Sequence, residues 1–262
     1  MLQLNAKSLV TAIARNQAHR LLGGAVRGGH RQREWNPAKR NGHVDYAFDS
    51  LAPHLDPLDG CLAVEIGPGD HLGLARRLIE AGCREVIAVE KYAQPGRLGD
   101  SDPHIEFVAC PVEEFDPPEP VDVIVSNDVL EHVDVAATMR HCFAVLRPGG
   151  QFVSSVDLRG HNTFNKPDRP LDFLTCPDWL YGLMHSHIET SNRVRRSDLV
   201  RAAEEAGFAV EAVEPIEAIG TDYVRAVRPH LLPRYRELAE DDLSTAQVVI
   251  ALRKPAAVNK PR

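Results

Sequence analysis

Short apolar runs recur along the middle of the chain and are separated by stretches with helical periodicity. The runs cover Cys61–Ile66, Glu85–Glu90, Ile105–Ala109, Val121–Ser126 and Gln151–Val156. Short strands that are apolar on both faces are typical of a parallel sheet covered by helices on each side. The alternation therefore predicts a doubly wound, mostly parallel α/β domain.

Helical periodicity and glycine stops divide the chain into five expected segments. They are a basic N-terminal helical arm (1–50), a cofactor-binding half (51–157), an inserted cap (158–195), the C-terminal part of the same α/β domain (196–254) and a tail (255–262). Within the arm we expect one helix over 1–22 and irregular structure over 25–50, with a short helix ending near Leu55. The C-terminal part is expected to contain helices over 197–206 and 223–239 and strands over 208–213 and 246–252.

Composition and charge restrict the function classes. Among the 262 residues there is no apolar run of about 18 residues, which argues against a membrane span. Five cysteines without a C-x-x-C pair fit a reducing cytoplasm better than a disulfide framework. Residues 1–40 contain eight Lys or Arg and one acid, whereas the others contain 22 bases and 36 acids. The arm is thus expected to be a solvated helix packed on an acidic body, or to make a weak contact with an anionic surface. The acidic body argues against nucleic acid as a partner.

A glycine turn follows the first apolar run, in the sequence Val64-Glu65-Ile66-Gly67-Pro68-Gly69. Glycines let the backbone turn sharply and approach a ligand at the N-terminus of the next helix. Dinucleotide enzymes have G-x-G-x-x-G at such a turn, but the third position is Leu72 in this chain. The carboxylate of Glu65 would repel a pyrophosphate and would suit a positively charged amine. The turn therefore predicts a cofactor that carries an amino acid.

An acid, Glu90, ends the next apolar run, 23 residues after Gly67. An acid in that place accepts hydrogen bonds from both hydroxyls of a ribose. Tyr92 is placed to stack on a purine. The structural alternative for Glu90 is a solvated strand end, but its distance from the glycine turn favours ribose binding.

These residues and three further motifs, in the same order, resemble the class I S-adenosylmethionine-dependent methyltransferases and their type 11-like members. The further motifs are Val112-Glu113-Glu114-Phe115 beside adenine, Val123 to Val133 in the fourth strand and its loop, and Leu146-Arg147-Pro148-Gly149-Gly150 before the fifth strand. The resemblance implies a Rossmann-like, seven-stranded sheet with an antiparallel last strand, and S-adenosylmethionine as cofactor. The cofactor-binding residues that it implies are Glu65, Gly67, Pro68, Gly69, Glu90, Lys91, Glu113, Asn127 and Asp128. The chain departs from the family pattern at His71, which replaces a glycine, and at Cys110-Pro111, where the family has an aspartate.

The insertion after the fifth strand is where we expect the acceptor chemistry. Its Asp157-x-x-x-His161 and Asn192-Arg193-x-Arg195 patterns resemble a bacterial subgroup that accompanies glycan or natural-product assembly. His161, at the carboxyl end of a strand, is the candidate catalytic base, and His132 is the second candidate. Asn192 and Arg193 are expected to bind polar groups of the acceptor, and the alternative for each of these side chains is a contact within the protein.

Four aromatic residues, Phe164, Phe173, Trp179 and Tyr181, predict that 158–195 caps the acceptor, with help from His43 and Tyr46. The alternative is that they pack a satellite core. His185-Ser186-His187 would place two histidines on one face of a strand, but no third ligand with suitable spacing accompanies them, so no metal site is predicted.

Three functional interpretations follow. The main one is an S-adenosylmethionine-dependent methyltransferase that acts on a hydroxyl of a sugar, glycan or secondary metabolite. The alternatives are a nucleotide-dependent oxidoreductase on a similar sheet and a catalytically silent relative that serves as a binding or scaffold protein. The expected partner is a small-molecule or glycan acceptor, and a homodimer is also considered.

Overall fold

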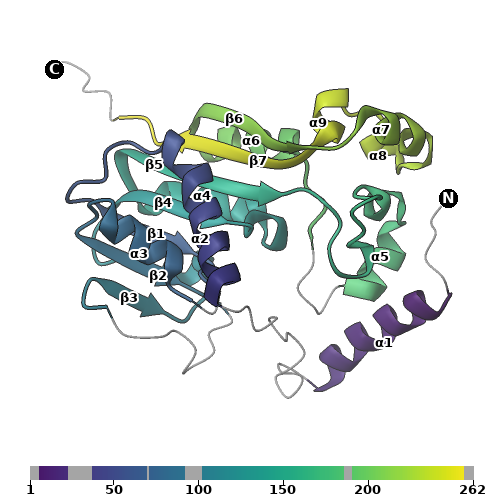
Figure 1. Cartoon of the computed structure of the whole chain (residues 1–262), viewed down its shortest axis with the longest axis horizontal. Helices are drawn as coiled ribbons and strands as arrows, with labels where there is room; N and C mark the ends of the chain where they lie inside the picture. Colours follow the sequence, from purple (N-terminus) through teal and green to yellow (C-terminus); the bar gives the residue numbers. More distant parts are fainter. Residues whose placement is uncertain (1–5, 23–36, 70, 92–101, 186–190, 257–262) are drawn as a thin grey trace.

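A seven-stranded sheet forms the centre of the computed structural model, which describes residues 6–22, 37–69, 71–91, 102–185 and 191–256 (Figure 1). The strand order is β3-β2-β1-β4-β5-β7-β6. In this described sheet β7 runs antiparallel to β5 and β6, and the other pairs are parallel, which confirms the predicted fold class. The strands are β1 (Leu62–Ile66), β2 (Glu85–Val89), β3 (Ile105–Val108), β4 (Val121–Asn127), β5 (Leu146–Asp157), β6 (Ala209–Ala218) and β7 (Thr245–Arg253).

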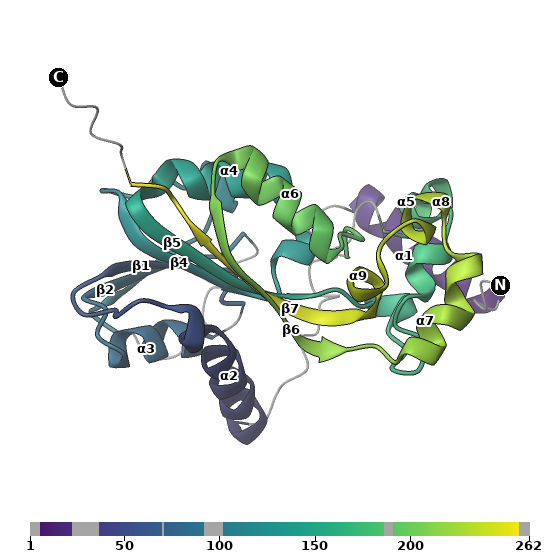
Figure 2. The ribbon, with the colours of Figure 1, turned by 90° about the horizontal axis from the view of Figure 1, so that it is seen from above.

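Helices cover both faces of this sheet, with α2 and α3 on one side and α4 and α6 on the other (Figure 2). The described helices are α1 (Ala6–Leu22), α2 (Pro37–Leu51), α3 (Gly73–Glu80), α4 (Val135–Val145), α5 (Asp178–His185), α6 (Arg196–Ala206), α7 (Thr221–Val227), α8 (Pro233–Arg236) and α9 (Glu240–Ser244). Alternate strand residues point to opposite faces. In β1, Leu62 and Val64 therefore join the core beneath α4 and α6, whereas Ala63 joins the core beneath α2 and α3.

A second body of the molecule, which we call the helical lobe, consists of α1, α5, α7, α8, α9 and the segment 158–176. It has its own apolar core, which includes Ala12 of α1, Phe173, Tyr181, Val224 and Leu243. The helical lobe is thus built from the N-terminal arm, the insertion and the C-terminal part of the chain together.

The aromatic residues of the insertion divide between the core and the surface. Phe164, Phe173 and Tyr181 are buried in the core of the helical lobe, whereas Trp179 is 68% exposed. This arrangement is the satellite core that the sequence left open as the alternative to a cap.

Three expected elements differ in the structure. The short helix expected to end near Leu55 is present as the longer helix α2, which begins at Pro37, within the segment expected to be irregular, and packs on α3 and the sheet. The single helix expected over 223–239 is wrong, because Pro229 and Pro233 lack an amide hydrogen and divide this segment into α7, a 3-10 turn (Arg228–His230) and α8. Strand β6 continues to Ala218, past the expected end at Val213.

A buried guanidinium joins the helical lobe to the sheet. Arg195 is 0% exposed and donates to three carbonyl oxygens, of Leu158 at 2.6 Å, Asp242 at 2.8 Å and Thr245 at 2.7 Å. Burial lowers its pKa to about 10, even though the carboxylate of Asp242 favours the charged form. These bonds connect the residue that follows β5, helix α9 and the start of β7, so Arg195 fixes where the chain leaves and re-enters the sheet.

Replacing Arg195 should destabilise the protein strongly. We expect Arg195→Met to lower the free energy of unfolding by about 3–5 kcal/mol, because three buried carbonyls lose their donor. Urea denaturation measures the change. The control is Arg201→Met, on the exposed side of α6 beside Asp198, for which we expect a change within about 0.5 kcal/mol. Similar small losses in both variants would contradict the role of Arg195.

Candidate functional site

The turn between β1 and α3 depends on two glycines with left-handed backbone. The φ angle is +74° at Gly67 and +70° at Gly69. The amide of Gly67 donates to the carbonyl of Val89 at 2.9 Å, which joins the turn to the end of β2. A Cβ atom on Gly67 would lie 2.5 Å from Cγ2 of Val129. The turn therefore lies against the loop after β4, where the order of strands reverses between β1 and β4 and where open α/β sheets bind ligands.

Glu65 points a buried carboxyl group toward this turn. It is 4% exposed, and its Oε2 has no hydrogen-bond partner among the described residues. Burial raises its pKa from 4.5 to about 8, although a hydrogen bond from the backbone of Ala75 favours the charged form. Since the unfolded chain ionises this group at the lower value, the buried carboxyl costs stability as the pH rises from 4.5 toward 8. A cationic ligand would remove that cost.

Glu90 lies directly after β2 and is tied to the same turn. Its Oε2 accepts a hydrogen bond from the amide of Gly69 at 3.1 Å. The structure thus brings Glu65, Gly67, Gly69 and Glu90 together, with the exposed Lys91 following Glu90 and the buried Pro68 between the glycines. Tyr92, the expected purine contact, lies outside the described residues.

Asn127 and Asp128 end β4 in a strained conformation. Asp128 has a φ angle of +54°, and its amide donates to the carbonyl of Ser155 at 3.0 Å. Gln247 of β7 donates to Asp128 Oδ1 at 3.1 Å, and Asn127 Oδ1 accepts from the hydroxyl of Ser155 at 2.6 Å. Burial and the charge of Asp157 raise the pKa of Asp128 to about 6. The ends of β4, β5 and β7 therefore share one polar network.

The two histidines selected as candidate bases lie together at this edge. The ring centroids of His132 and His161 are 4.9 Å apart. His161 Nε2 lies 3.4 Å from Asp157 Oδ2, in an ion-pair contact. Burial raises the pKa of Asp157, but hydrogen bonds from His161 and Arg159 outweigh it and hold the pKa below its ordinary value. Asp157 is thus ionised and orients His161.

Sequence reasoning did not assign a role to Glu131, which the structure buries completely between these groups. Its Oε1 accepts from the amide of Asp157 at 3.4 Å and lies 3.9 Å from His132 Nε2. Burial and the charge of Asp128 raise its pKa well above the ordinary value, which disfavours its charged form. The signal in the sequence was an acid directly after the apolar residue that opens a loop, Leu130-Glu131-His132.

The expected acceptor-binding residues of α2 reach the same edge. The hydroxyl of Tyr46 donates to Gln247 Oε1 at 3.1 Å and lies 3.5 Å from Glu217 Oε1. Burial and the charges of Glu217 and Asp128 raise its pKa. His43 lies one turn earlier on α2, and burial lowers its pKa. Helix α2 therefore carries Tyr46 into the polar network that includes Asp128.

Asn192 and Arg193, expected to bind the acceptor, contact the protein instead. The amide group of Asn192 donates to the carbonyls of Leu130 at 2.7 Å and Val133 at 2.8 Å. The guanidinium of Arg193 is buried, donates to the carbonyl of Cys176 at 2.8 Å, pairs with Asp178 and lies over the ring of Tyr181. These contacts are the alternative that the sequence left open, and a role of either side chain toward an acceptor stays a prediction. Asn192 supports the loop of His132, and Arg193 belongs to the helical lobe.

Glu113, the expected adenine contact, is exposed on a 3-10 turn (Val112–Glu114). Its Oε1 accepts a hydrogen bond from the hydroxyl of Thr138 on α4 at 2.8 Å. This contact fixes the carboxylate against α4, and its role toward adenine stays a prediction.

The metal hypothesis for His185 loses its geometric basis. His185 ends helix α5 instead of lying on a strand, and burial lowers its pKa to about 4. Ser186 and His187 lie outside the described residues. In the described part of the chain no group of three or more His, Cys, Asp or Glu residues could hold a metal ion.

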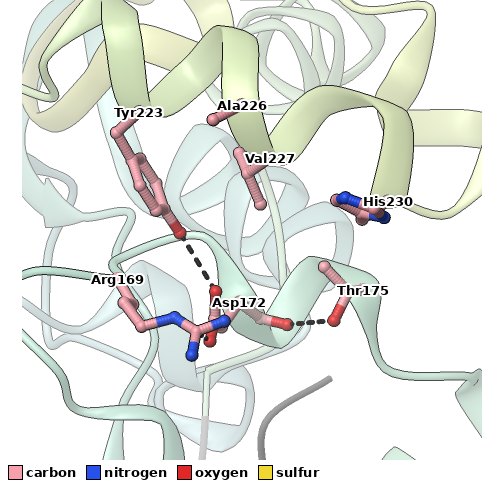
Figure 3. A pocket seen from close by; sticks show the side chains of 7 residues that line it. All are labelled: Arg169, Asp172, Thr175, Tyr223, Ala226, Val227 and His230. Atoms are coloured by element: carbon pink, nitrogen blue, oxygen red, sulfur yellow. Dashed lines mark hydrogen bonds and ion pairs between the residues drawn. The ribbon is translucent and has the colours of Figure 1, made fainter. Parts of the chain in front are cut away.

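A separate cavity of about 220 Å³ lies in the helical lobe (Figure 3). Asp172 is its central polar group and accepts from the hydroxyl of Tyr223 at 3.2 Å and from Arg169 at 2.8 Å. The hydroxyl of Thr175 donates to the Asp172 carbonyl at 2.7 Å. These groups satisfy one another and hold the segment 169–175 to α7, so we interpret the cluster as structural.

Comparison with known proteins gives a consistent result. Residues 33–213 match the family model described as a methyltransferase domain. A ubiquinone biosynthesis O-methyltransferase of Bradyrhizobium sp. (strain ORS 278) is 30% identical over 126 residues, which are 45% of this chain and 48% of that protein. Another of the same name, from Paramagnetospirillum magneticum, is 31% identical over 110 residues, covering 38% and 42% of the two chains. The chain thus spans about half the length of these curated relatives.

Solved structures show the same fold. An S-adenosylmethionine-dependent methyltransferase from Mesorhizobium loti superposes with a TM-score of 0.54 at 21% identity, covering 81% of this chain and 99% of that one. A geranyl diphosphate methyltransferase in complex with geranyl diphosphate and sinefungin gives a TM-score of 0.52 at 20% identity, with 81% and 77% covered.

Adding one methyl group to the glycine turn should disrupt it. We expect Gly67→Ala to lower the free energy of unfolding by about 1–3 kcal/mol, because of the left-handed backbone and the clash with Val129. Thermal or urea unfolding measures it. The control is Gly42→Ala in α2, where a Cβ meets nothing within 4 Å and where we expect a gain of about 0.5–1 kcal/mol. A neutral effect at Gly67 would show that the turn tolerates a side chain.

Proposed function

This chain belongs to the methyltransferase domain family, and from that premise we propose that it transfers a methyl group from S-adenosylmethionine to a hydroxyl group of a small acceptor. The observation that carries the hydroxyl assignment is the pair formed by His161 and the ionised Asp157 at the carboxyl edge of the sheet. A hydroxyl has a high pKa and therefore gains from a base held in place, whereas the methyl group needs only alignment.

The cofactor of this family, S-adenosylmethionine, fits the residues around the glycine turn. It carries an amine, and Glu65 Oε2 is a buried acceptor without a partner among the described residues. Its ribose would bind to Glu90, and the bare backbone of Gly67 and Gly69 would lie against its amino-acid part. Asn127, Asp128 and Lys91 would complete the contacts, and the adenine contact of Glu113 belongs to the same proposal.

Bound S-adenosylmethionine supplies a methyl group that the positive charge on sulfur has already activated. The protein's part is to orient the acceptor hydroxyl toward that carbon and to take its proton. Nε2 of His161 faces Asp157, so Nδ1 is the nitrogen that accepts the proton as the oxygen gains its bond to carbon. The carboxylate of Asp157 then stabilises the resulting imidazolium.

Glu131 and Asn192 act as positioning residues in this scheme. Glu131 holds the amide of Asp157, and Asn192 holds the carbonyls on both sides of His132. The raised pKa of Glu131 opposes a third negative charge beside Asp128 and Asp157. The ring of His132, tilted by 56° against that of His161, then limits the rotation of His161.

The acceptor is proposed to be a sugar, glycan or secondary metabolite with several polar groups. Tyr46, Arg159, Glu217 and Gln247 surround the approach to the histidines, and hydroxyl-rich molecules match such donors and acceptors. A phenolic hydroxyl is the second candidate, because the curated relatives are named ubiquinone biosynthesis O-methyltransferases. Assaying S-adenosylhomocysteine release with matched panels of sugars and phenols discriminates the two.

The comparisons bear differently on the two alternative functions, an oxidoreductase and a silent scaffold. Family membership removes the reason for an oxidoreductase. A silent scaffold would bind the cofactor without turnover on any acceptor of the panels.

The described cysteines are all free thiols, which agrees with the cytoplasmic location that we propose.

Removing the proposed base should reduce turnover and spare cofactor binding. We expect His161→Ala and His161→Asn to lower kcat by about 10²–10⁴ while the Kd for S-adenosylmethionine is unchanged. Asp157→Asn should also lower kcat, because the imidazolium formed when His161 takes the proton loses its carboxylate partner. His104→Ala, an exposed histidine at the start of β3, is the control with unchanged kcat. Near-normal kcat in both His161 variants would remove it as the base.

Cofactor binding should release a proton at pH 7. Glu65, with a pKa of about 8, is protonated in the unliganded protein, and a positive amine beside it favours the carboxylate. Calorimetric titration with S-adenosylhomocysteine in buffers of different ionisation enthalpy measures the release. Glu65→Gln should abolish it and weaken binding. The assignment is overturned if the wild type and Glu65→Gln release the same number of protons.

A further inference from the structure

Large apolar side chains that face solvent gather in one part of the described chain. The exposed fractions are 65% for Val10, 81% for Leu21, 68% for Trp179 and 42% for Leu183, and the other large apolar residue in this class is Tyr46 of the candidate site. Val10 and Leu21 lie on α1, and Trp179 and Leu183 lie on α5. We call these four side chains the α1–α5 face.

The two helices pack directly on each other. Asn16 Nδ2 donates to the carbonyl of Leu183 at 2.8 Å, and Ala12 belongs to the same core as Tyr181. Both ribbon views place α1 beside α5, at the end of the molecule away from β1 and β2 (Figures 1 and 2). The two helices that carry the α1–α5 face therefore belong to one packed unit.

Helical spacing separates these side chains from the ones that hold the helices together. On α1, Val10 and Leu21 are 11 residues apart, about three turns, so they share a side, while Ala12 and Asn16 point inward. On α5, Trp179 and Leu183 are one turn apart on the outside, while Tyr181 and Met184 are buried. The exposed residues thus contribute little to the core of the helical lobe.

The charge around this face is positive. Helix α1 carries the exposed residues Lys7, Arg15 and Arg20 and no Asp or Glu. The acid of α5, Asp178, is paired with Arg193 and Arg234. Outside residues 1–40 the chain has an excess of acids, 36 against 22 bases. A negatively charged layer would attract the α1–α5 face and repel the rest of the molecule, which fixes the orientation of docking.

From these observations we propose that the α1–α5 face is a docking surface for an anionic lipid bilayer. Trp179, Leu183 and Leu21 enter the boundary between headgroups and acyl chains, where tryptophan is favoured. Lys7, Arg15 and Arg20 contact the negative headgroups. Within the described residues no helix is long and apolar enough to cross a bilayer, so the association is peripheral.

Vesicle binding by the full chain tests the proposal without any need for turnover. Trp35→Phe leaves Trp179 as the remaining tryptophan of the two in the chain, so a blue shift of its emission reports insertion. We expect binding and a blue shift with phosphatidylcholine–phosphatidylglycerol vesicles, reversed by high salt, and neither with phosphatidylcholine alone.

Substitutions separate the apolar contribution to vesicle binding from the contribution of the charged side chains. Co-sedimentation should show at least about tenfold weaker binding for the double variant Trp179→Ala/Leu183→Ala. We expect about fivefold weaker binding for each of Lys7→Ala and Arg20→Ala. Arg140→Ala, an exposed arginine of α4 on the other body, is the matched charge control and should bind as the wild type.

Three results would overturn the proposal. They are no binding to the anionic vesicles, equal binding to both vesicle types, or the same loss for Arg140→Ala as for Lys7→Ala. A dimer in sedimentation velocity that Trp179→Ala/Leu183→Ala dissociates would instead assign the α1–α5 face to a second copy of the chain.

Discussion

The arrangement of the two bodies depends on the buried guanidinium of Arg195. Three carbonyls, of Leu158 directly after β5, Asp242 in α9 and Thr245 at the start of β7, accept hydrogen bonds from this one cation. Apolar packing alone would not specify how the helical lobe sits on the sheet, because it has no direction. A guanidinium, which is a planar donor with fixed geometry, specifies that arrangement. The lobe consequently stands over the carboxyl edge that holds Asp157 and His161.

At that edge, three acidic side chains lie close together in surroundings that exclude most water. Asp128, Glu131 and Asp157 lie on neighbouring strands or loops, and three ionised carboxylates could not be accommodated together. Different contacts reduce this conflict: burial raises the pKa of Glu131, Asp128 accepts a hydrogen bond from Gln247, and Asp157 pairs with His161 and Arg159. Glu65, beside the glycine turn, is a buried carboxyl group without a counterion among the described residues. The two acids Asp128 and Asp157 thus have partners within the protein, whereas Glu65 Oε2 has none among the described residues and would suit a cationic ligand.

Much of the fold could be predicted because it rests on local patterns. All five residues of β1 are buried and four of them are apolar, so the strand is visible in the sequence, and Gly67 indicates the turn because few other residues adopt its φ angle. Where the local pattern gave a wrong prediction, a contact between residues distant in the sequence, or a proline, determined the structure. Helix α2 has a weak pattern and gains its order from packing on α3, and Pro229 and Pro233 divide a segment whose apolar spacing is helical.

The sequence by itself determined the sheet, the glycine turn and the identity of its acids, Glu65 and Glu90, because these follow from residues close together in the chain. Only the tertiary structure decided which side chains share a site. Asn192 and Arg193 are neighbours in sequence, yet the positive φ of Arg193 sends its guanidinium to Cys176 and Asp178 while Asn192 holds the loop of His132. Tyr46 and Gln247 are 201 residues apart and hydrogen bonded. Such pairings depend on how the elements pack, and the energy that selects them, burial of polar groups with satisfied partners, exists only once the chain is folded.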